Sequence, residues 1–118
     1  MVGKSLMDKN CPLCRLAHWD EGYPRDLKTE LFYDDGAVIV VTDLNPKGYA
    51  MRVLAVWRDH VPVDGLGIRE WEKMYDILHG VADAVAFKRG LSFVQVDIEN
   101  HSIMEHEHFQ ACLRKVKE

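Results

Sequence analysis

The sequence has no long apolar run. Its most apolar stretch, AVIVV at positions 37–41, is five residues long, whereas a membrane-spanning helix needs about 20 apolar residues. The first ten residues, MVGKSLMDKN, also lack the apolar centre of a signal peptide. We therefore expect a cytoplasmic protein that does not bind membranes, with residues 1–10 forming a short lead-in to the domain.

The sequence also has no excess of positive charge. It contains 15 lysine and arginine residues against 19 aspartate and glutamate residues, which gives a net charge of -4. A protein that holds a nucleic-acid polymer normally presents a basic surface to the phosphate backbone, so we expect small-molecule partners instead. With 118 residues, 47% of them hydrophobic, the chain is long enough for one core, and we expect a single domain at 11–118.

Cysteine is scarce as well. Cys11 and Cys14 form a Cys-x-x-Cys motif, and the third cysteine, Cys112, is distant in sequence. Three cysteines in a reducing compartment argue against a disulfide framework. The pair could bind a metal, act as a redox motif or be a coincidence. A thioredoxin-like redox pair should follow a strand, and the residues before Cys11 have no strand character, so metal binding is the favoured interpretation.

The hydrophobic pattern predicts one long helix and five strands. Apolar residues recur every three or four positions over 68–88, as in an amphipathic helix, and Gly90 is placed to end it. The Asp35-Gly36 dipeptide lies between two β-prone segments, which indicates a hairpin. The predicted strands are 30–34, 37–43, 50–57, 92–98 and 106–113. This order favours an α+β domain, in which a mainly antiparallel five-stranded sheet has one face covered by the helix.

The last predicted strand includes most of the sequence MEHEHFQ at 104–110. Alternate side chains of a strand point to the same face. Four residues should therefore share one surface: His106, His108, Gln110 and Cys112. Such a face is either a working site or a solvated strand that happens to contain histidine, and the residue types alone leave both interpretations open.

A zinc site would explain one residue of this face, His106, as a metal ligand. Zinc in proteins prefers four cysteine, histidine or carboxylate ligands in a tetrahedron, and Cys-x-x-Cys would supply two of them from one turn. His60 follows the third predicted strand, and His106 begins the last one. A Cys₂His₂ site would then consist of Cys11, Cys14, His60 and His106. Such a site stabilises a small domain whose core is limited.

Several segments resemble the histidine triad (HIT) superfamily of nucleotidyl hydrolases and transferases. They are CPLC at 11–14, TDLNPKGYAMRVLAVWRDH at 42–60, the long helix, and IEN at 98–100 followed by HEHFQ at 106–110. Members typically carry His-x-His-x-His. Here the third histidine is replaced by Gln110, and this variant motif resembles that of the branch that contains galactose-1-phosphate uridylyltransferase and diadenosine tetraphosphate phosphorylase. The resemblance implies a HIT-like fold, a nucleotide substrate, and a homodimer with the helix and a sheet edge at its interface.

The resemblance also implies a role for each motif residue. His108, at the middle position, would attack the α-phosphorus of a nucleotide and form a nucleotidyl-histidine intermediate. A neutral imidazole suits this step, because it titrates near neutral pH and attacks without first losing a proton. Gln110 would donate a hydrogen bond to the phosphoryl oxygens. His106 would join Cys11, Cys14 and His60 on a structural zinc.

Five further positions match residues that bind the nucleotide in the family. Asp43 corresponds to an acidic residue that binds both ribose hydroxyls, although an aspartate at this place is equally suited to a turn. Asn100 corresponds to a residue that helps to place the phosphate. Leu13, Leu16 and Leu44 correspond to the base pocket, but leucine at such positions is also common as plain core.

Two features depart from the family pattern. Only HSIME at 101–105 separates Asn100 from the first motif histidine, where the family has a longer, glycine-containing phosphate loop. Glu107 occupies a position that is usually apolar or proline. We expect its carboxylate to reach solvent, a partner subunit or a cation, because an unpaired buried carboxylate is costly. The histidines outside the motifs are expected to be ordinary surface or helix residues: His18, His79 and His101.

Three functions remain open at this point. The first is a zinc-containing nucleotidyl hydrolase or transferase that acts on phosphoramidates or dinucleoside polyphosphates through His108. The second is a zinc-stabilised nucleotide-binding or regulatory module without turnover, which the short loop and the missing third histidine favour. The third is a purely structural metalloprotein.

Overall fold

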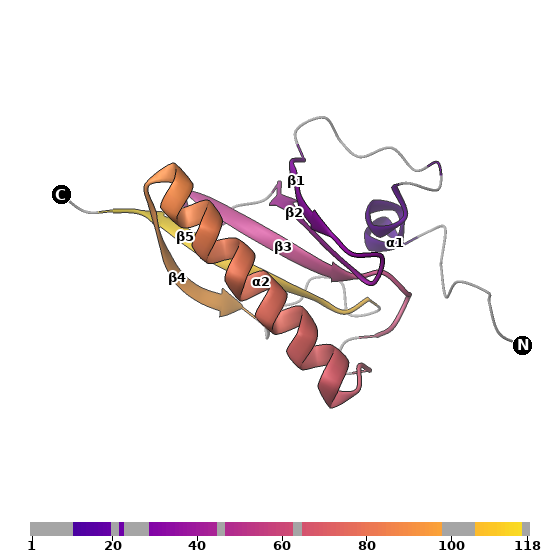
Figure 1. Cartoon of the computed structure of the whole chain (residues 1–118). Coiled ribbons are helices and arrows are strands. Elements are labelled where there is room, and N and C mark those ends of the chain that lie inside the picture. Colours follow the sequence, from indigo (N-terminus) through magenta and orange to yellow (C-terminus); the bar gives the residue numbers. More distant parts are fainter. Residues whose placement is uncertain are drawn as a thin grey trace, which may run out of the picture.

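The computed structural model describes residues 11–19, 22, 29–44, 47–62, 65–97 and 106–116. Within these ranges the chain forms two helices and five strands (Figure 1). In chain order the elements are α1 (Pro12–Ala17), β1 (Leu31–Asp34), β2 (Val38–Asp43), β3 (Met51–Trp57), α2 (Ile68–Arg89), β4 (Leu91–Asp97) and β5 (His108–Lys115). The expected lead-in at 1–10, together with Asn100 and His101, lies outside the described residues.

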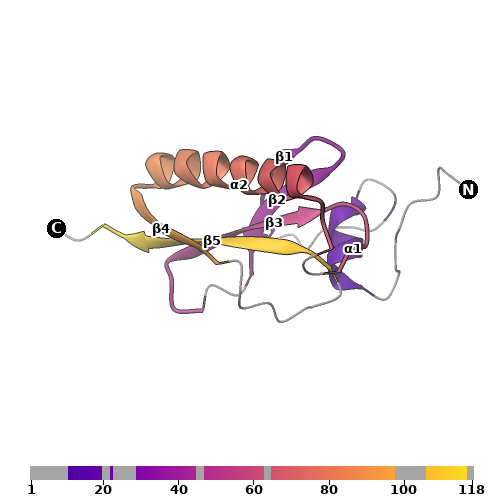
Figure 2. The same cartoon turned by 90° about the horizontal axis from the view of Figure 1, so that it is seen from below.

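The five strands form one antiparallel sheet. Their order across the sheet is β1-β2-β3-β5-β4, and every neighbouring pair is antiparallel. α2 lies along one face of this sheet (Figure 2), and α1 packs against the other face on β2 and β3. The predicted α+β architecture, a mainly antiparallel five-stranded sheet covered on one face by a long helix, is confirmed.

α2 is attached to the sheet by one stripe of apolar side chains. Met74, Leu78, Ala82 and Val85 are buried at spacings of three and four residues, so they lie on one side of the helix. They pack against residues of β2, β3 and β5 in the main hydrophobic core. The helix ends where predicted, at Gly90, whose φ of 66° is left-handed and therefore suits glycine.

The alternation of side chains in β5 separates the core from the candidate site. The residues that pack beneath α2 are Phe109, Ala111 and Leu113. Since successive side chains of a strand point to opposite faces, His108, Gln110 and Cys112 point away from α2. The predicted division of this strand into a polar and an apolar face is confirmed from His108 onward.

A second, smaller core attaches α1 to the opposite face of the sheet. It contains apolar residues of the α1 region and of the β2–β3 pair: Cys11, Leu13, Cys14, Ala17, Ile39, Val41, Leu54 and Val56. A helix of six residues is not stable by itself, so the burial of this apolar surface is what holds it. The Cys-x-x-Cys motif is thereby brought next to β3, which His60 follows.

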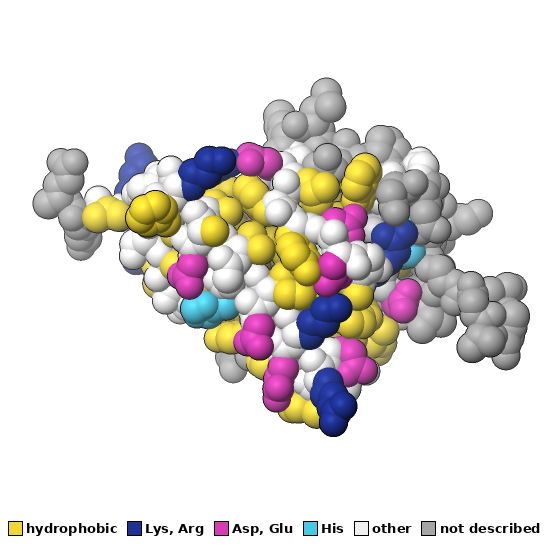
Figure 3. All heavy atoms as spheres, in the orientation of Figure 1, with side chains coloured by type: hydrophobic (Ala, Val, Ile, Leu, Met, Phe, Trp, Pro, Cys, Tyr) yellow, Lys and Arg dark blue, Asp and Glu magenta, His cyan; other side chains and the backbone are white. Residues whose placement is uncertain are grey.

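The surface on the α2 side is mixed in character. Hydrophobic and charged side chains lie side by side there (Figure 3). A hollow of about 240 Å³ lies between β1 and α2, with Phe32, Val81 and Arg89 among its lining residues. Neither helix in the described part of the chain is both long and apolar enough to cross a membrane.

Candidate functional site

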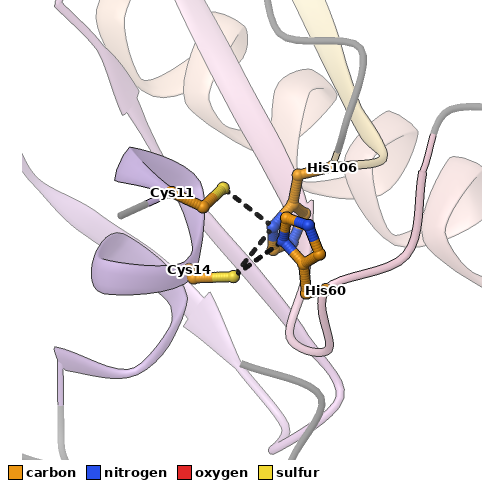
Figure 4. Close-up of side chains that lie close together, drawn as sticks. All are labelled: Cys11, Cys14, His60 and His106. Carbon is orange, nitrogen blue, oxygen red and sulfur yellow. Dashed lines mark hydrogen bonds between the residues drawn. The ribbon is translucent and has the colours of Figure 1, made fainter. Parts of the chain in front are cut away.

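Four side chains from distant segments converge beside the end of β3 (Figure 4). They are Cys11, Cys14, His60 and His106, and their donor atoms all lie within 4.8 Å of one another. The Sγ atom of Cys14 is 3.2 Å from Nδ1 of His60 and 3.3 Å from Nδ1 of His106, which is 3.4 Å from Sγ of Cys11. The usual bond lengths of a tetrahedral zinc site give sulfur–nitrogen edges of about 3.5 Å. The four predicted ligands are therefore spaced to hold one metal ion of this size.

α1 places both cysteines. Cys11 is the N-cap residue with an extended backbone, and Pro12 follows at the start of the helix, where its restricted φ is favourable. Cys14 lies three positions further on, and residues at this spacing are neighbours on a helix surface. Both thiols are fully buried, and none of the chain's three cysteines, all within the described residues, forms a disulfide. The reduced pair is thus available to bind a metal.

The ring of His106 is oriented by the end of β3. Its Nε2 atom lies 2.6 Å from the carbonyl oxygen of Trp57. A carbonyl only accepts, so Nε2 donates, and Nδ1 keeps the lone pair that faces the cysteine sulfurs. Burial lowers the pKa of His106 to about 4, although the Trp57 carbonyl opposes this effect. The imidazole is therefore neutral at neutral pH, which is the form that binds metals.

His108 is connected to the same segment of backbone. Its Nδ1 atom lies 2.8 Å from the carbonyl oxygen of His106, so Nδ1 carries the proton and Nε2 carries the lone pair. The side chain is buried and lies across from Val56 of β3. One hydrogen bond therefore joins the predicted metal ligand to the predicted nucleophile.

Gln110 follows His108 on the same face of β5. It is buried and pairs with Leu54 of β3 and Asp97 of β4. Its Oε1 atom accepts no hydrogen bond from the residues that the structure describes. Buried polar atoms without a partner are uncommon in folded proteins, and a catalytic role is one recognised reason for them. An acceptor oxygen cannot pair with a phosphoryl oxygen, so the predicted contact, in which the amide nitrogen of Gln110 donates, stays a prediction.

Glu107 is only 1% exposed, which corrects the expectation that its carboxylate reaches solvent or a partner subunit, whereas its contact with a cation stays a prediction. Its Oε1 atom accepts a hydrogen bond from the backbone N–H of His108 (3.2 Å), and this donor offsets part of the cost of burial. The backbone N–H of Glu107 donates to the carbonyl of Val61 (2.7 Å), beyond the end of β3. The carbonyl of Glu107 accepts the backbone N–H of Trp57 (3.3 Å), and the regular strand β5 begins at His108, two residues later than predicted.

The other predicted substrate-binding positions have different surroundings. Leu13 and Leu16 pack in the small core around α1, whereas Leu44 is 53% exposed. Asp43 is the last residue of β2, and Asn100 lies outside the described residues. The packing of the two α1 leucines agrees with the plain-core alternative. Binding of a nucleotide by these positions stays a prediction.

His18 contributes to the site in a way that sequence patterns did not indicate. The expectation of an ordinary surface or helix residue is wrong, because His18 is fully buried at the C-terminal cap of α1. Its Nε2 atom donates to the carbonyl oxygen of Arg58 (2.9 Å), and Arg58 in turn donates to the carbonyl of Ala17 (3.4 Å). These bonds hold the cysteine-bearing helix against the segment that carries His60. His79, in contrast, is exposed on α2, as predicted.

The sequence patterns also did not indicate Arg52 as a residue near the candidate site. It is the single charged residue of β3 (MRVLAVW), and a charge in an otherwise apolar strand is the signal that could have found it. Its side chain is buried, and its Nη1 atom lies 3.9 Å from Oδ2 of Asp43. The predicted ribose-binding residue is therefore paired with a buried cation.

Comparison with known proteins finds no match at the level of sequence, either to a family model or to a curated protein. Solved structures do match. A HIT family hydrolase from Clostridium thermocellum has a TM-score of 0.65 at 19% identity, over 90% of this chain and 91% of that chain. A histidine triad protein from Clostridium difficile has a TM-score of 0.64 at 19% identity, over 94% and 96%. A HIT family protein from Bacillus anthracis has a TM-score of 0.68 at 16% identity, over 92% and 76%.

The chain has the HIT fold. The HIT-like architecture that the sequence motifs implied is thus confirmed by structures of low sequence identity. At such identities the similarity establishes the fold alone, and one fold carries many functions. The activity has to be argued from the side chains placed on it.

Proposed function

We propose that this HIT-fold chain is a nucleotidyl hydrolase or transferase with a structural zinc. The observation that carries the proposal is the hydrogen bond from Nδ1 of His108 to the carbonyl oxygen of His106. It selects the tautomer in which Nε2 holds a lone pair, and such an atom is the nucleophile that this reaction needs. Proteins named HIT family hydrolases are among the structures of similar fold, which supports this class of reaction.

The proposed reaction has two steps. First, Nε2 of His108 attacks the α-phosphorus, a nitrogen–phosphorus bond forms, and the bond from phosphorus to the leaving group breaks. The leaving group is an amine, which takes up a proton, or the second nucleotide of a dinucleoside polyphosphate. Water then attacks the phosphorus, the nitrogen–phosphorus bond breaks, and a nucleoside monophosphate departs. Phosphate or another acceptor in place of water makes the protein a transferase, as in the branch that Gln110 resembles.

Other residues bind the substrate in this proposal. The amide of Gln110 donates to the phosphoryl oxygens, where negative charge accumulates as the reaction proceeds. Asp43 accepts hydrogen bonds from the two ribose hydroxyls, because a carboxylate offers two acceptor oxygens. Asn100 helps to place the phosphate. The base contacts Leu13, Leu16 and Leu44.

The donor set of the metal centre supports zinc. Two thiolates and two neutral imidazoles are typical ligands of structural zinc sites, and four protein ligands close the tetrahedron. Zinc supplies folding energy in such a site, since the ligands are not assembled in the unfolded chain. Here Cys11, Cys14, His60 and His106 would connect α1, the segment after β3 and the approach to β5. The zinc would have a structural role only, and His108 would be the nucleophile of the reaction.

Detection of a covalent adduct tests the proposal. Wild-type protein incubated with an α-phosphate-labelled nucleoside phosphoramidate or dinucleoside polyphosphate should carry label that is stable in base and lost in acid. His108→Ala should not be labelled, whereas His79→Ala, at an exposed position of α2, should behave as wild type. Wild-type labelling of His108→Ala would contradict the assignment of the nucleophile. Nucleotide binding without adduct or product favours a binding module, and the absence of binding favours a structural metalloprotein.

A further inference from the structure

Arg52 is a buried charge on the proposed substrate side of the sheet. It pairs with Asp43 of β2 on one side and with Cys112 of β5 on the other. Residues directly opposite each other in antiparallel strands share a face, so these three side chains form one row across the sheet. Cys112 is two residues after Gln110 on the same face of β5. The row of Asp43, Arg52 and Cys112 is therefore adjacent to the row that contains Gln110.

The two charges of this row differ in depth. The side chain of Arg52 is 2% exposed, whereas that of Asp43 is 15% exposed. A guanidinium removed from water needs a counter-charge, and the Asp43 carboxylate supplies one at 3.9 Å. Its burial keeps Arg52 from direct contact with a ligand. The more exposed carboxylate is the group that a ligand can reach.

The guanidinium is also held from its other side. Cys112 lies directly opposite Arg52 on β5; burial raises the pKa of its thiol, and the nearby Arg52 acts in the opposite direction. An arginine side chain presents several N–H donors in a rigid planar fork. Enclosed between two strands, this fork restricts the direction in which the Asp43 carboxylate points.

We infer that Arg52 is a positioning residue for Asp43, and that the pair selects ribonucleotides over 2′-deoxyribonucleotides. The inference rests on the proposed function, in which Asp43 binds both ribose hydroxyls. A carboxylate has about four acceptor positions, so an ion pair with one guanidinium nitrogen is compatible with two hydroxyl donors. A site that is built to hydrogen-bond a hydroxyl strongly rejects the analogue that lacks it. This selection therefore requires that the Asp43 carboxylate be oriented precisely toward the ribose hydroxyls.

Matched sugar pairs test the inference. We would compare kcat/KM for ribo- and 2′-deoxyribonucleoside phosphoramidates in wild type, Arg52→Gln and Arg52→Lys. Arg52→Gln should lower the ratio of ribo to deoxy about tenfold, because a hydrogen bond to a charged group is weakened. Arg52→Lys keeps the charge without the fork and should be intermediate. Arg89→Gln removes a partly exposed arginine of α2 and should keep the wild-type ratio. An unchanged ratio in Arg52→Gln would overturn the inference.

A double variant separates positioning from general stabilisation. If Arg52 acts through Asp43, Arg52→Gln combined with Asp43→Asn should show the ratio of Asp43→Asn alone, and a further fall contradicts the inference. Should the Arg52 variants fail to fold, NMR of the wild type replaces them. The Nε–H signal of Arg52 should shift with the ribonucleotide and not with its 2′-deoxy analogue, and equal shifts count against the inference. A wild type that binds and converts neither nucleotide removes the proposed function as well.

Discussion

The Nδ1 atom of His108 lies 2.8 Å from the backbone carbonyl oxygen of His106, whose own ring faces the sulfurs of Cys11 and Cys14. His106 therefore has two tasks. Its side chain belongs to the candidate metal centre, and its backbone orients the neighbouring imidazole. A metal ion bound there would restrict the backbone of His106 and, with it, the ring of His108. Removal of the metal should consequently lower reactivity even where the fold survives.

Cys14→Ser should remove the metal, because a serine hydroxyl is a much poorer zinc ligand than a thiolate. We expect the metal content to fall from about one ion per chain to near zero. The free energy of unfolding should fall on the order of 5 kcal/mol. Elemental analysis and urea unfolding measure the two effects. Cys112→Ser is the matched control, since Cys112 is equally buried but lies outside the cluster, and it should keep its metal. Unchanged metal and stability in Cys14→Ser would remove the metal centre.

Gln110→Ala should lower kcat by about a hundredfold, the usual effect of removing one donor to a developing negative charge. KM should change little, because the contact strengthens in the transition state. Steady-state kinetics on a nucleoside phosphoramidate measure both constants. Gln95→Ala, at an exposed position of β4, should leave them unchanged. A rise in KM at constant kcat would instead mean that Gln110 binds the ground state.

Asp35 stabilises the β1–β2 turn in its ionised form. Its Oδ1 atom accepts the backbone N–H groups of Ala37 and Val38 (2.9 Å each), and its Oδ2 atom lies 3.2 Å from Nζ of Lys73. Burial acts to raise the pKa of Asp35, but the hydrogen bonds outweigh it and lower the pKa from 3.8 to about 2. Between these two values the unfolded chain binds more protons than the folded one. The stabilisation is therefore present above about pH 4 and is lost as the pH falls toward 2.

Asp35→Asn should lower the free energy of unfolding by about 1 kcal/mol at pH 7, after allowance for solvent screening. The difference from wild type should shrink as the pH approaches 2, since the wild-type carboxyl is then protonated as well. Urea unfolding at a series of pH values gives this difference, and NMR of the side-chain carboxyl gives the pKa directly. A difference that is constant from pH 7 to pH 2, or an NMR pKa near 3.8, would contradict the assignment.

Leu78→Ala should lower the free energy of unfolding by about 2–5 kcal/mol, because Leu78 is fully buried between α2 and the sheet and its truncation leaves a cavity. Phe87→Ala on the same helix should change it by less than about 0.5 kcal/mol, since Phe87 is 90% exposed. Urea unfolding of the two variants checks the packing of α2. Equal losses would mean that the helix buries a different face.

The helix and the strands could be predicted from sequence because their signals are local. The apolar spacing of three and four residues over 68–88 anticipated α2, and Asp35-Gly36 anticipated the hairpin between β1 and β2. The start of β5 was placed two residues early. The alternation in MEHEHFQ does not mark where the regular strand begins, because that depends on the backbone contacts of Glu107 with Trp57 and Val61.

The candidate metal ligands could be predicted because few residue types bind zinc. Once Cys11 and Cys14 were recognised as a pair, the choice was among a small number of histidines. The strand ends suggested His60 and His106, and the resemblance to the HIT superfamily selected the fourth ligand. His18 escaped prediction because its burial depends on the carbonyl of Arg58, 40 positions away. No periodic pattern reports a contact of that kind.

The sequence by itself determined the long helix, the strands apart from the start of β5, the two faces of β5 and the candidate metal ligands, because these follow from periodicity, turn chemistry and ligand preference. Only the tertiary structure decided which nitrogen of His106 and of His108 keeps its lone pair, because carbonyl groups of the backbone assign the protons. It likewise decided that Arg52 lies opposite Asp43 across the β2–β3 pair. The contacts of His106 with Trp57 and of Arg52 with Asp43 join separate segments of the chain, whereas the contact of His108 with His106 depends on the local backbone conformation. All three exist only in the folded chain.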